Sequence, residues 1–432
     1  MKEGYAVSTA AEVLAGKTTP QVEVRGWVAR KHMVGGLLFA LIRDGTGYVQ
    51  VSARKGASDS AYNVAKEATK ESAVIVRGSV RDDRRAPGGR EIAATEFEIA
   101  ALAENWPITS TAARSPGFLF DKRHLSIRGP KAIASMRIRA EVIGAAFDYF
   151  RESGFQLISA PTFVQAAVEG GSTLFAVDYF GKKASLSQSA QFYEEAALPA
   201  LQKVWIFQPA FRAEKSKTAK HLTEFWMIES EQAFTTQSDN MKIQEGLLSR
   251  MVERVLERRQ AELKILGRTL KQPEMPFMRM TYDEARTIAE KKGFGFEWGD
   301  DLPTEAERAI SLTQDSPFFV TDYPLSARSF YHMTYPDRPK VTISADLLAP
   351  EGVGELATGG QRIHDYNELM SRIASQDLST ESFSWYLDLR KFGMPPHTGF
   401  GIGVERCTRW IAGLKHIRSA SLFPRTVSRI SP

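Results

Sequence analysis

The stretch FQPAFRAEKSKTAKHLTEFWMIESE, residues 207–231, decides the fold of the larger part of this chain. Its two apolar ends predict strands, with Arg212 and Glu214 standing where the first strand enters the connecting loop. That loop is basic and carries Lys215, Lys217, Lys220 and His221. Such a hairpin can hold a nucleotide, because a guanidinium pairs with a phosphate and Phe225 offers an aromatic face. Taken alone, however, a basic hairpin is more often a solvated loop.

The segments around this hairpin mix strand and helix patterns. Residues 131–153 (KAIASMRIRAEVIGAAFDYFRES) carry apolar side chains at helical spacing, and Gly154 ends the predicted helix. A long charged helix is predicted over about residues 238–265, and PFFVTDYP (317–324) and GFGIGVERCTRWIAGL (399–414) follow. The sequence therefore predicts an α+β domain over residues 131–432.

The N-terminal segment has the pattern of a small β-barrel. Five strand-like runs are present, with one polar helical stretch at 59–69 between the third and the fourth. This is the order of an OB barrel, a common binder of single-stranded nucleic acid. We predict an OB domain over residues 1–104. Residues 105–130 carry three prolines without clear periodicity and are predicted to be a linker.

Composition excludes several classes of protein. The 432 residues are 43% hydrophobic and 25% charged, which is typical of a soluble globular protein with two or three domains. No run of eighteen apolar residues and no signal-peptide pattern occur, so we expect a cytoplasmic protein without a membrane partner. Cys407 is the only cysteine, which excludes an intrachain disulfide and a cysteine zinc site. The net charge of +5 is only weak evidence for a polyanionic partner.

Three segments in order resemble the signature motifs of the class II aminoacyl-tRNA synthetases. The first is the helix 131–153 with the following strand to Pro161, the second is the hairpin 207–231, and the third is 399–414. Each pattern is weak alone, but three in the correct order are specific. The resemblance implies a class II catalytic domain, an antiparallel sheet flanked by helices. It also implies a homodimer through the first motif.

Further segments resemble the archaeal-type asparaginyl enzymes of the aspartyl/asparaginyl subgroup. They are EGGSTLF (169–175), LSQSAQFY (186–193), DLLAPEGVGE (346–355), GGQR (359–362), WYLDLRKFG (385–393) and LFPRT (422–426). The resemblance implies ligation of L-asparagine to tRNA(Asn) through an adenylate, with ATP as substrate and Mg²⁺ as cofactor. No side chain need act as nucleophile, since catalysis of this reaction is positioning and electrostatic stabilisation.

The resemblance also implies the roles of residues in the nucleotide site. Arg212 holds the α-phosphate and the transition state, and Arg406 and Phe225 sandwich the adenine. Glu214 meets the amino-group side of ATP, and His221 meets its β- and γ-phosphates. Glu355 binds Mg²⁺ and the hydroxyl of Thr358 joins it. Arg212 and Arg406 are thus the implied catalytic residues.

Other residues are assigned by the same resemblance to the amino acid and the anticodon. Glu169, Ser189 and Gln191 bind the ammonium and backbone of the amino acid. Glu229 accepts a hydrogen bond from the side-chain amide of asparagine, and Arg362 donates to the amide oxygen. The implied anticodon-binding residues in the barrel are Lys31, Phe39 and Gln50. A core-packing role is the alternative for Phe39.

Specificity for asparagine competes with specificity for aspartate. Aspartyl relatives usually carry an aspartate at the position of Glu229 and a lysine at that of Glu194, which favours asparagine here. The segments GQRIHDY (360–366) and MPPHTGF (394–400) are closer to aspartyl relatives. An aspartyl enzyme, including one that charges both tRNAs, is therefore the alternative. An amidating paralogue of this fold and a pure nucleic-acid-binding module are further alternatives.

Overall fold

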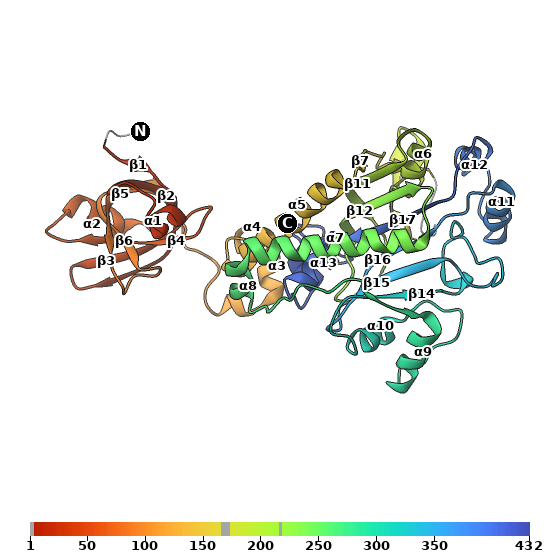
Figure 1. Cartoon of the computed structure of the whole chain (residues 1–432). Helices are drawn as coiled ribbons and strands as arrows, with labels where there is room; N and C mark the ends of the chain where they lie inside the picture. The colour runs from red at the N-terminus through yellow and green to blue at the C-terminus, as the bar shows by residue number, and fades with distance from the viewer. Residues whose placement is uncertain (1–3, 166–172, 216–217) are drawn as a thin grey trace. The chain divides into compact units, whose positions relative to one another are not determined.

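The computed structural model describes residues 4–165, 173–215 and 218–432. The chain divides into two compact units, Met1–Leu119 and Phe120–Pro432 (Figure 1). The predicted linker 105–130 contains the short helices η1 (Ala112–Arg114), α3 (Pro116–Asp121) and α4 (Arg123–Ser126). The buried side chain of Arg123 donates to the carbonyls of Ser421 and Leu422, which fastens α4 to the larger unit. The limits of that linker stay a prediction.

The smaller unit is a β-barrel. Its strands are β1 (Ala6–Val7), β2 (Gln21–Val34), β3 (Leu37–Arg43), β4 (Tyr48–Arg54), β5 (Ala73–Asp82) and β6 (Arg90–Ala101). They follow the order β1-β2-β3-β4-β6-β5, and β2 also pairs with β5, which closes the barrel. Helix α1 (Ala10–Ala15) precedes β2, and α2 (Asp59–Glu67) lies between β4 and β5 in the chain, as the sequence predicted. Alternate strand residues fill the interior.

The larger unit is built on an eight-stranded sheet with the order β13-β14-β15-β16-β17-β12-β11-β7. The strands are β7 (Gln156–Leu157), β11 (Lys203–Phe211), β12 (Glu224–Ala233), β13 (Met278–Thr281), β14 (Phe318–Thr321), β15 (Ser344–Ala349), β16 (Gly354–Gln361) and β17 (His397–Gly403). All neighbouring strands are antiparallel except β13–β14 and β11–β7. The prediction of an α+β protein with an antiparallel sheet is confirmed. The strand predicted up to Pro161 is shorter, since β7 has two residues.

Long helices cover one face of this sheet. Helix α5 (Pro130–Glu152) packs beside α7 (Gln237–Arg258), and α13 (Val404–Ile411) completes the layer (Figure 1). The helix predicted over about 238–265 is two helices, α7 and α8 (Gln260–Leu266). They meet at Arg259, whose Nε donates to Glu141 of α5 at 3.0 Å. A tertiary contact therefore accompanies a break that the sequence pattern does not signal.

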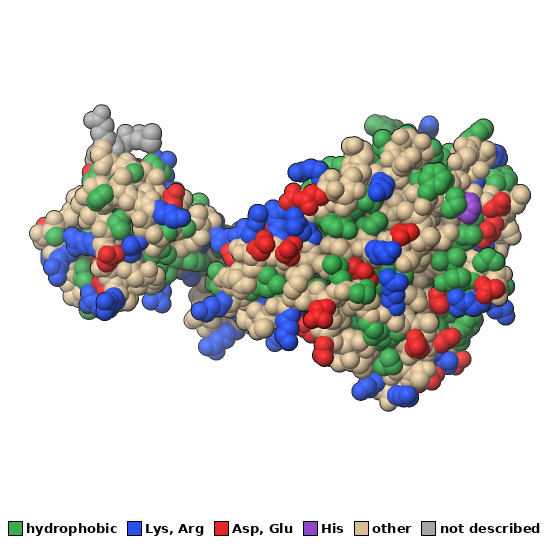
Figure 2. Space-filling view, viewed as in Figure 1, with side chains coloured by type: hydrophobic (Ala, Val, Ile, Leu, Met, Phe, Trp, Pro, Cys, Tyr) green, Lys and Arg blue, Asp and Glu red, His purple; other side chains and the backbone are tan. Residues whose placement is uncertain are grey.

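The remaining elements surround the other face of the sheet. They are the three-stranded sheet of β8 (Phe163–Val164), β9 (Ala176–Tyr179) and β10 (Lys182–Leu186), the turn η3 (Leu325–Ala327), and the helices α6 (Gln191–Leu201), α9 (Tyr282–Lys291), α10 (Thr304–Ser311), α11 (Tyr366–Ser375) and α12 (Ser384–Lys391). The turn η4 (Ile417–Ala420) instead packs against α5 and α13. Among the described residues, no helix is both long and apolar enough to span a membrane. Acidic and basic side chains are interspersed on the face of the larger unit shown in Figure 2.

Strand β12 shows how the sheet separates core from site. Trp226 and Ile228 point into the layer of α5 and α7 and join the apolar core. The alternate residues Phe225, Met227, Glu229 and Glu231 line a cavity on the opposite face. Because strand side chains alternate between faces, one strand serves the core and the site at once.

Candidate active site

A cavity of about 420 Å³ lies over the central strands on the face away from α5 and α7. Residues predicted for the nucleotide and residues predicted for the amino acid line it together. They are Ser189, Gln191, Arg212, Glu214, His221, Phe225, Glu229, Glu355, Thr358, Arg362 and Arg406. One predicted member, Glu169, lies outside the described residues, as does Lys217 of the basic loop. Segments separated by more than 200 positions therefore converge on one site.

The hairpin of β11 and β12 forms one end of this cavity. The guanidinium of Arg212 lies 5.5 Å from the centre of the Phe225 ring, so the cation and the aromatic face are adjacent. His221 Nδ1 is 2.5 Å from the hydroxyl of Thr218, and its Nε2 is 3.8 Å from Glu214. Burial, followed by the positive charge of Arg406, lowers the pKa of His221. This histidine is therefore a neutral hydrogen-bonding group near pH 7.

The basic loop is tied to α10. The ammonium of Lys220 pairs with the buried carboxylate of Glu307, which also accepts from the backbone N–H of Glu355 at 2.7 Å. Gly354 makes this approach possible, because a Cβ there would lie 1.7 Å from a Glu307 oxygen and its φ is +83°. The pair fixes the loop against β16, although the sequence singled out neither Glu307 nor α10.

Glu355 of β16 and Arg406 of α13 form an ion pair with each other. Arg406 Nη1 lies 2.5 Å from Glu355 Oε1, and the Thr358 hydroxyl lies 3.3 Å from the same oxygen. Burial alone would raise the pKa of Glu355, but Arg406 and Lys220 together with further arginines hold it at about 2. Glu355 is therefore an anion throughout the physiological pH range.

Asp346 adds an oxygen that the sequence did not single out. It lies opposite Thr358 in the β15–β16 register, and its Oδ2 accepts from Arg328 at 2.7 Å. Its Oδ1 is buried and has no hydrogen-bond partner among the described residues. Burial raises its pKa to about 6. Carboxylate and hydroxyl oxygens are the ligands that Mg²⁺ prefers, so Asp346, Thr358 and Glu355 fit this ion.

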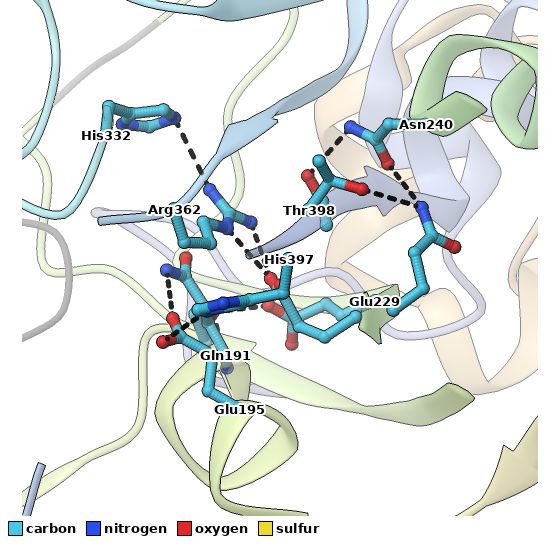
Figure 3. A network of polar contacts seen from close by, with 12 residues as sticks. Gln191, Glu195, Glu229, Asn240, His332, Arg362, His397 and Thr398 are labelled. Carbon is cyan, nitrogen blue, oxygen red and sulfur yellow. Dashed lines mark hydrogen bonds and ion pairs between the residues drawn. The ribbon is translucent and has the colours of Figure 1, made fainter. Parts of the chain in front are cut away.

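The far end of the cavity is lined by α6, β12 and the end of β16. Glu229 accepts from the hydroxyl of Ser189 and, at 2.9 Å, from the backbone N–H of Ala190. Arg362 donates to Glu231 through Nε at 3.0 Å and Nη2 at 2.6 Å, and His332 lies 3.4 Å from Nη1 (Figure 3). A Cβ at Gly399 would lie 2.0 Å from the Glu231 carboxylate. Glycine is therefore required beside this ion pair.

A buried ion-pair network lies behind this wall. Glu195 accepts from Arg390 at 2.5 Å, from the Tyr386 hydroxyl at 2.8 Å and faces His397 Nε2 at 3.0 Å. The atoms of Glu195, Glu231 and His397 lie close enough together to hold a metal ion. Two guanidiniums already neutralise these carboxylates, however, because Arg362 binds Glu231 and Arg390 binds Glu195. This cluster is structural (Figure 3).

The barrel places the predicted anticodon residues on its outer surface. Phe39 and Gln50 belong to adjacent strands and are half-buried, outside the interior core cluster. Phe39 stacks on His32 at 5.1 Å, and Gln50 Nε2 donates to Glu91 at 2.9 Å. The core-packing alternative for Phe39 is therefore not supported.

Lys31 has a different environment from its two predicted companions. Its ammonium donates to the carbonyls of Ala65, Lys66 and Ala68 at 3.3, 2.7 and 2.5 Å. These carbonyls end α2, so Lys31 neutralises the negative end of that helix. All three of its donors are engaged within the barrel. A role in anticodon binding stays a prediction for this residue.

Comparisons with known proteins decide the family. The model of the tRNA synthetases of class II (D, K and N) matches residues 115–427, and an OB-fold nucleic acid binding domain model matches 22–100. The asparagine--tRNA ligase of Thermococcus kodakarensis is 44% identical over 98% of this chain and 99% of its own length. That of Pyrococcus furiosus is 46% identical over 95% and 96%. The chain belongs to the asparagine--tRNA ligases of class II.

Solved structures agree with this family of class II synthetases. The asparaginyl-tRNA synthetase of Pyrococcus horikoshii complexed with asparaginyl-adenylate superposes with a TM-score of 0.92 at 44% identity, covering 95% of this chain and 96% of that one. The Entamoeba histolytica asparaginyl-tRNA synthetase superposes with a TM-score of 0.92 at 29% identity, covering 99% of this chain and 100% of that one. A putative aspartyl-tRNA synthetase of Leishmania major, at 23% identity and 0.88, shows the shared fold alone. The predicted OB barrel and class II domain are confirmed.

Proposed function

We propose that this chain activates L-asparagine with ATP and transfers it to the terminal adenosine of tRNA(Asn). One observation carries the proposal. The residues predicted for ATP and those predicted for asparagine line the two ends of a single cavity. In this reaction the asparagine carboxylate attacks the α-phosphate, pyrophosphate leaves, and the 3′-hydroxyl of tRNA then takes the acyl group. Both steps need the reactants held together rather than a protein nucleophile.

The nucleotide end supplies electrostatic stabilisation. The guanidinium of Arg212 lies beside the ring of Phe225. It can hold the α-phosphate while negative charge develops on that phosphate during attack. Arg406 and Phe225 take the two faces of the adenine, and Glu214 and His221 contact its amino side and the outer phosphates. Glu355 and Thr358, with Asp346, hold Mg²⁺. A metal ion bound there neutralises phosphate charge.

The other end selects the amino acid. Ser189 and Gln191, with Glu169 from outside the described residues, bind the ammonium and backbone of asparagine. Arg362, held by Glu231, donates to the amide oxygen, and Glu229 accepts from the amide nitrogen. Aspartate presents an anion to the same carboxylate and is rejected by like-charge repulsion. The aspartyl alternative loses support, since the relatives reported above at 44% and 46% identity are asparagine--tRNA ligases.

The barrel binds the anticodon through Phe39 and Gln50, together with Lys31. Two half-buried residues on the outer face of the barrel, one aromatic and one an amide, can stack on and hydrogen-bond to an unpaired base. We expect the site of action to be the cytoplasm. The decisive test is charging with labelled asparagine on a tRNA(Asn) transcript and on one whose anticodon is changed. Loss of charging on the changed transcript supports the proposal, and equal charging of both contradicts anticodon reading.

A homodimer is the expected assembly. Strand β7 is an edge strand of the eight-stranded sheet, and Leu157 within it is 44% exposed. An exposed apolar edge favours pairing with a second copy. Light scattering at micromolar concentration should give twice the chain mass. A fully active monomer would contradict this assembly.

A further inference from the structure

Glu194 has a carboxylate that none of the described residues bonds. It stands in the first turn of α6, lines the cavity, and is 1% exposed. Neither of its carboxylate oxygens has a hydrogen-bond partner among the residues that the structure describes. A buried carboxylate without donors is costly, and such groups are normally paired. The fold therefore tolerates Glu194 without using it for stability.

Each acidic neighbour of Glu194 already accepts at least one hydrogen bond, although Glu231 Oε2 is also buried without a partner among the described residues. Glu229 accepts from Ser189 and Ala190, Glu231 from Arg362, and Glu195 from Arg390. Burial raises the pKa of Glu194 well above its usual value, the charges of Glu229 and Glu231 raise it further, and Arg362 opposes them. Glu194 thus shares the far end of the cavity with Glu229 and Arg362, where the side chain of the amino acid is expected.

The donors of an amide fit this arrangement. A primary amide has two N–H donors and one acceptor oxygen. If Arg362 donates to the oxygen and Glu229 accepts one N–H, the second N–H still needs an acceptor. Glu194 is the remaining carboxylate on this wall with both oxygens available. A carboxylate ligand has no N–H donor to offer to either of these acidic side chains.

We propose that Glu194 is a specificity-determining residue whose carboxylate accepts the second N–H of the asparagine side-chain amide. This inference rests on the proposed function and deepens it. Aspartate has no side-chain N–H to donate to Glu194 and therefore loses this bond. The lack of a bond from any described residue leaves this acceptor available to the substrate.

Two substitutions separate this role from simple packing. Glu194→Leu fills similar space without an acceptor, and Glu194→Gln keeps one acceptor but removes the charge. Glu245→Gln is a matched control, because Glu245 is also buried but lies on α7, away from the cavity, where it accepts from Phe277 N–H. ATP–pyrophosphate exchange is measured while the concentration of asparagine, of aspartate or of ATP is varied. Each series gives the KM and kcat of each protein for that substrate. Thermal unfolding checks that each variant is folded.

For Glu194→Leu we expect the KM for asparagine to rise about tenfold or more, as for a lost hydrogen bond to a charged group, while the KM for ATP stays unchanged. Glu194→Gln should restore most of the asparagine affinity and should raise exchange with aspartate. The Glu245→Gln protein should have the wild-type KM and kcat for asparagine, aspartate and ATP. A packing defect is not expected to raise the KM for asparagine while leaving the KM for ATP unchanged.

An unchanged asparagine KM and an unchanged asparagine-to-aspartate ratio in Glu194→Leu would overturn the role of Glu194. Should that variant fail to fold, the ratio in Glu194→Gln decides alone, and an unchanged ratio overturns the proposal. A wild type that does not respond to asparagine contradicts the proposed function itself. The two failures are therefore distinguishable.

Discussion

Arg362 Nη2 lies 2.6 Å from Glu231 Oε1, and Nε donates to the same oxygen at 3.0 Å. Both side chains are almost fully buried, and they come from the end of β16 and from β12. Two bonds from one planar group fix its orientation, which a single bond would not. Glu231 therefore positions the guanidinium that we assign to the amide oxygen.

This relationship predicts that charge alone cannot replace Arg362. Lysine cannot form both bonds to Glu231 and reach the substrate, because its ammonium is a point charge on a flexible stem. Arg362→Lys should lose at least about tenfold in kcat/KM for asparagine, as for one lost hydrogen bond to a charged group. Exchange kinetics with asparagine measure this loss. Wild-type kinetics in a folded Arg362→Lys protein would remove Arg362 from the substrate site.

Arg212 is expected to act on the transition state. Arg212→Ala should lower the rate of adenylate formation at least ~10²-fold, because the preplaced charge is lost where negative charge develops. Single-turnover formation of the adenylate at saturating ATP and asparagine measures this step. Arg308→Ala is a control, since Arg308 lies on α10 outside the cavity lining. Near-normal adenylate formation without Arg212 would exclude the assigned role.

Glu229 should discriminate between asparagine and aspartate through its negative charge. Glu229→Gln keeps the shape but removes the repulsion of aspartate, and it also loses an acceptor for Ser189 or Ala190. We expect weaker activity with asparagine and a smaller gap between asparagine and aspartate. Exchange with each amino acid measures the gap. An unchanged ratio would place the discrimination in other residues, such as those around His364.

Phe39 is expected to act only on tRNA. Phe39→Ala should weaken tRNA binding by about 1–3 kcal/mol through lost base stacking. Pyrophosphate exchange without tRNA should stay at the wild-type value, because the catalytic cavity lies in the other unit. Filter binding and exchange on the same preparation test both statements. Equal loss in both assays would indicate a folding defect instead.

Glu195 is predicted to stabilise the fold in a pH-dependent way. Burial alone would raise its pKa, but Arg390 and His397 outweigh it and hold the pKa well below the usual 4.5. A lowered folded-state pKa gives stability that is present above pH 4.5 and lost as the pH falls below it. Glu195→Gln should cost about 3 kcal/mol at pH 7, because Arg390 stays buried without its counter-charge.

Urea unfolding of wild type and Glu195→Gln at several pH values measures this difference. The gap should shrink as the pH falls below about 4, since the Glu195 carboxylate of the unfolded chain then takes up a proton while that of the folded chain stays ionised. Glu253→Gln is the control, because Glu253 pairs with Arg250 at an exposed site. Its effect should stay within about 0.5 kcal/mol. A pH-independent gap would contradict the ionic role of Glu195.

The sequence predicted the parts of the site that lie within its motifs. Arg212 and Phe225 stand in the second motif and Arg406 in the third, and Glu355 ends the further segment 346–355. The structure brings all four to one cavity. Alternation along β12 could also have indicated Glu231, which lies two residues from Glu229 on the same face. Asp346 stands at the start of a segment that the resemblance covered, so its oxygen could have been proposed as well.

Other features depend on partners that a sequence does not display. Nothing in the α6 pattern distinguishes Glu194, which has no partner among the described residues, from Glu195, which has several. The break between α7 and α8 occurs at Arg259 without a proline or glycine, where a contact with Glu141 of α5 is made. Lys31 likewise caps a helix that is distant in sequence. These outcomes follow from tertiary contacts rather than from local propensity.

The most direct test of the whole account is ATP–pyrophosphate exchange by the purified wild-type chain, with asparagine or aspartate as the amino acid at saturating ATP and Mg²⁺. We expect exchange with asparagine and a kcat/KM for aspartate lower by at least about 10²-fold, as when a ligand anion meets a buried carboxylate. Exchange that prefers aspartate would contradict the assignment of the cavity. Exchange with neither amino acid would contradict the proposed activity.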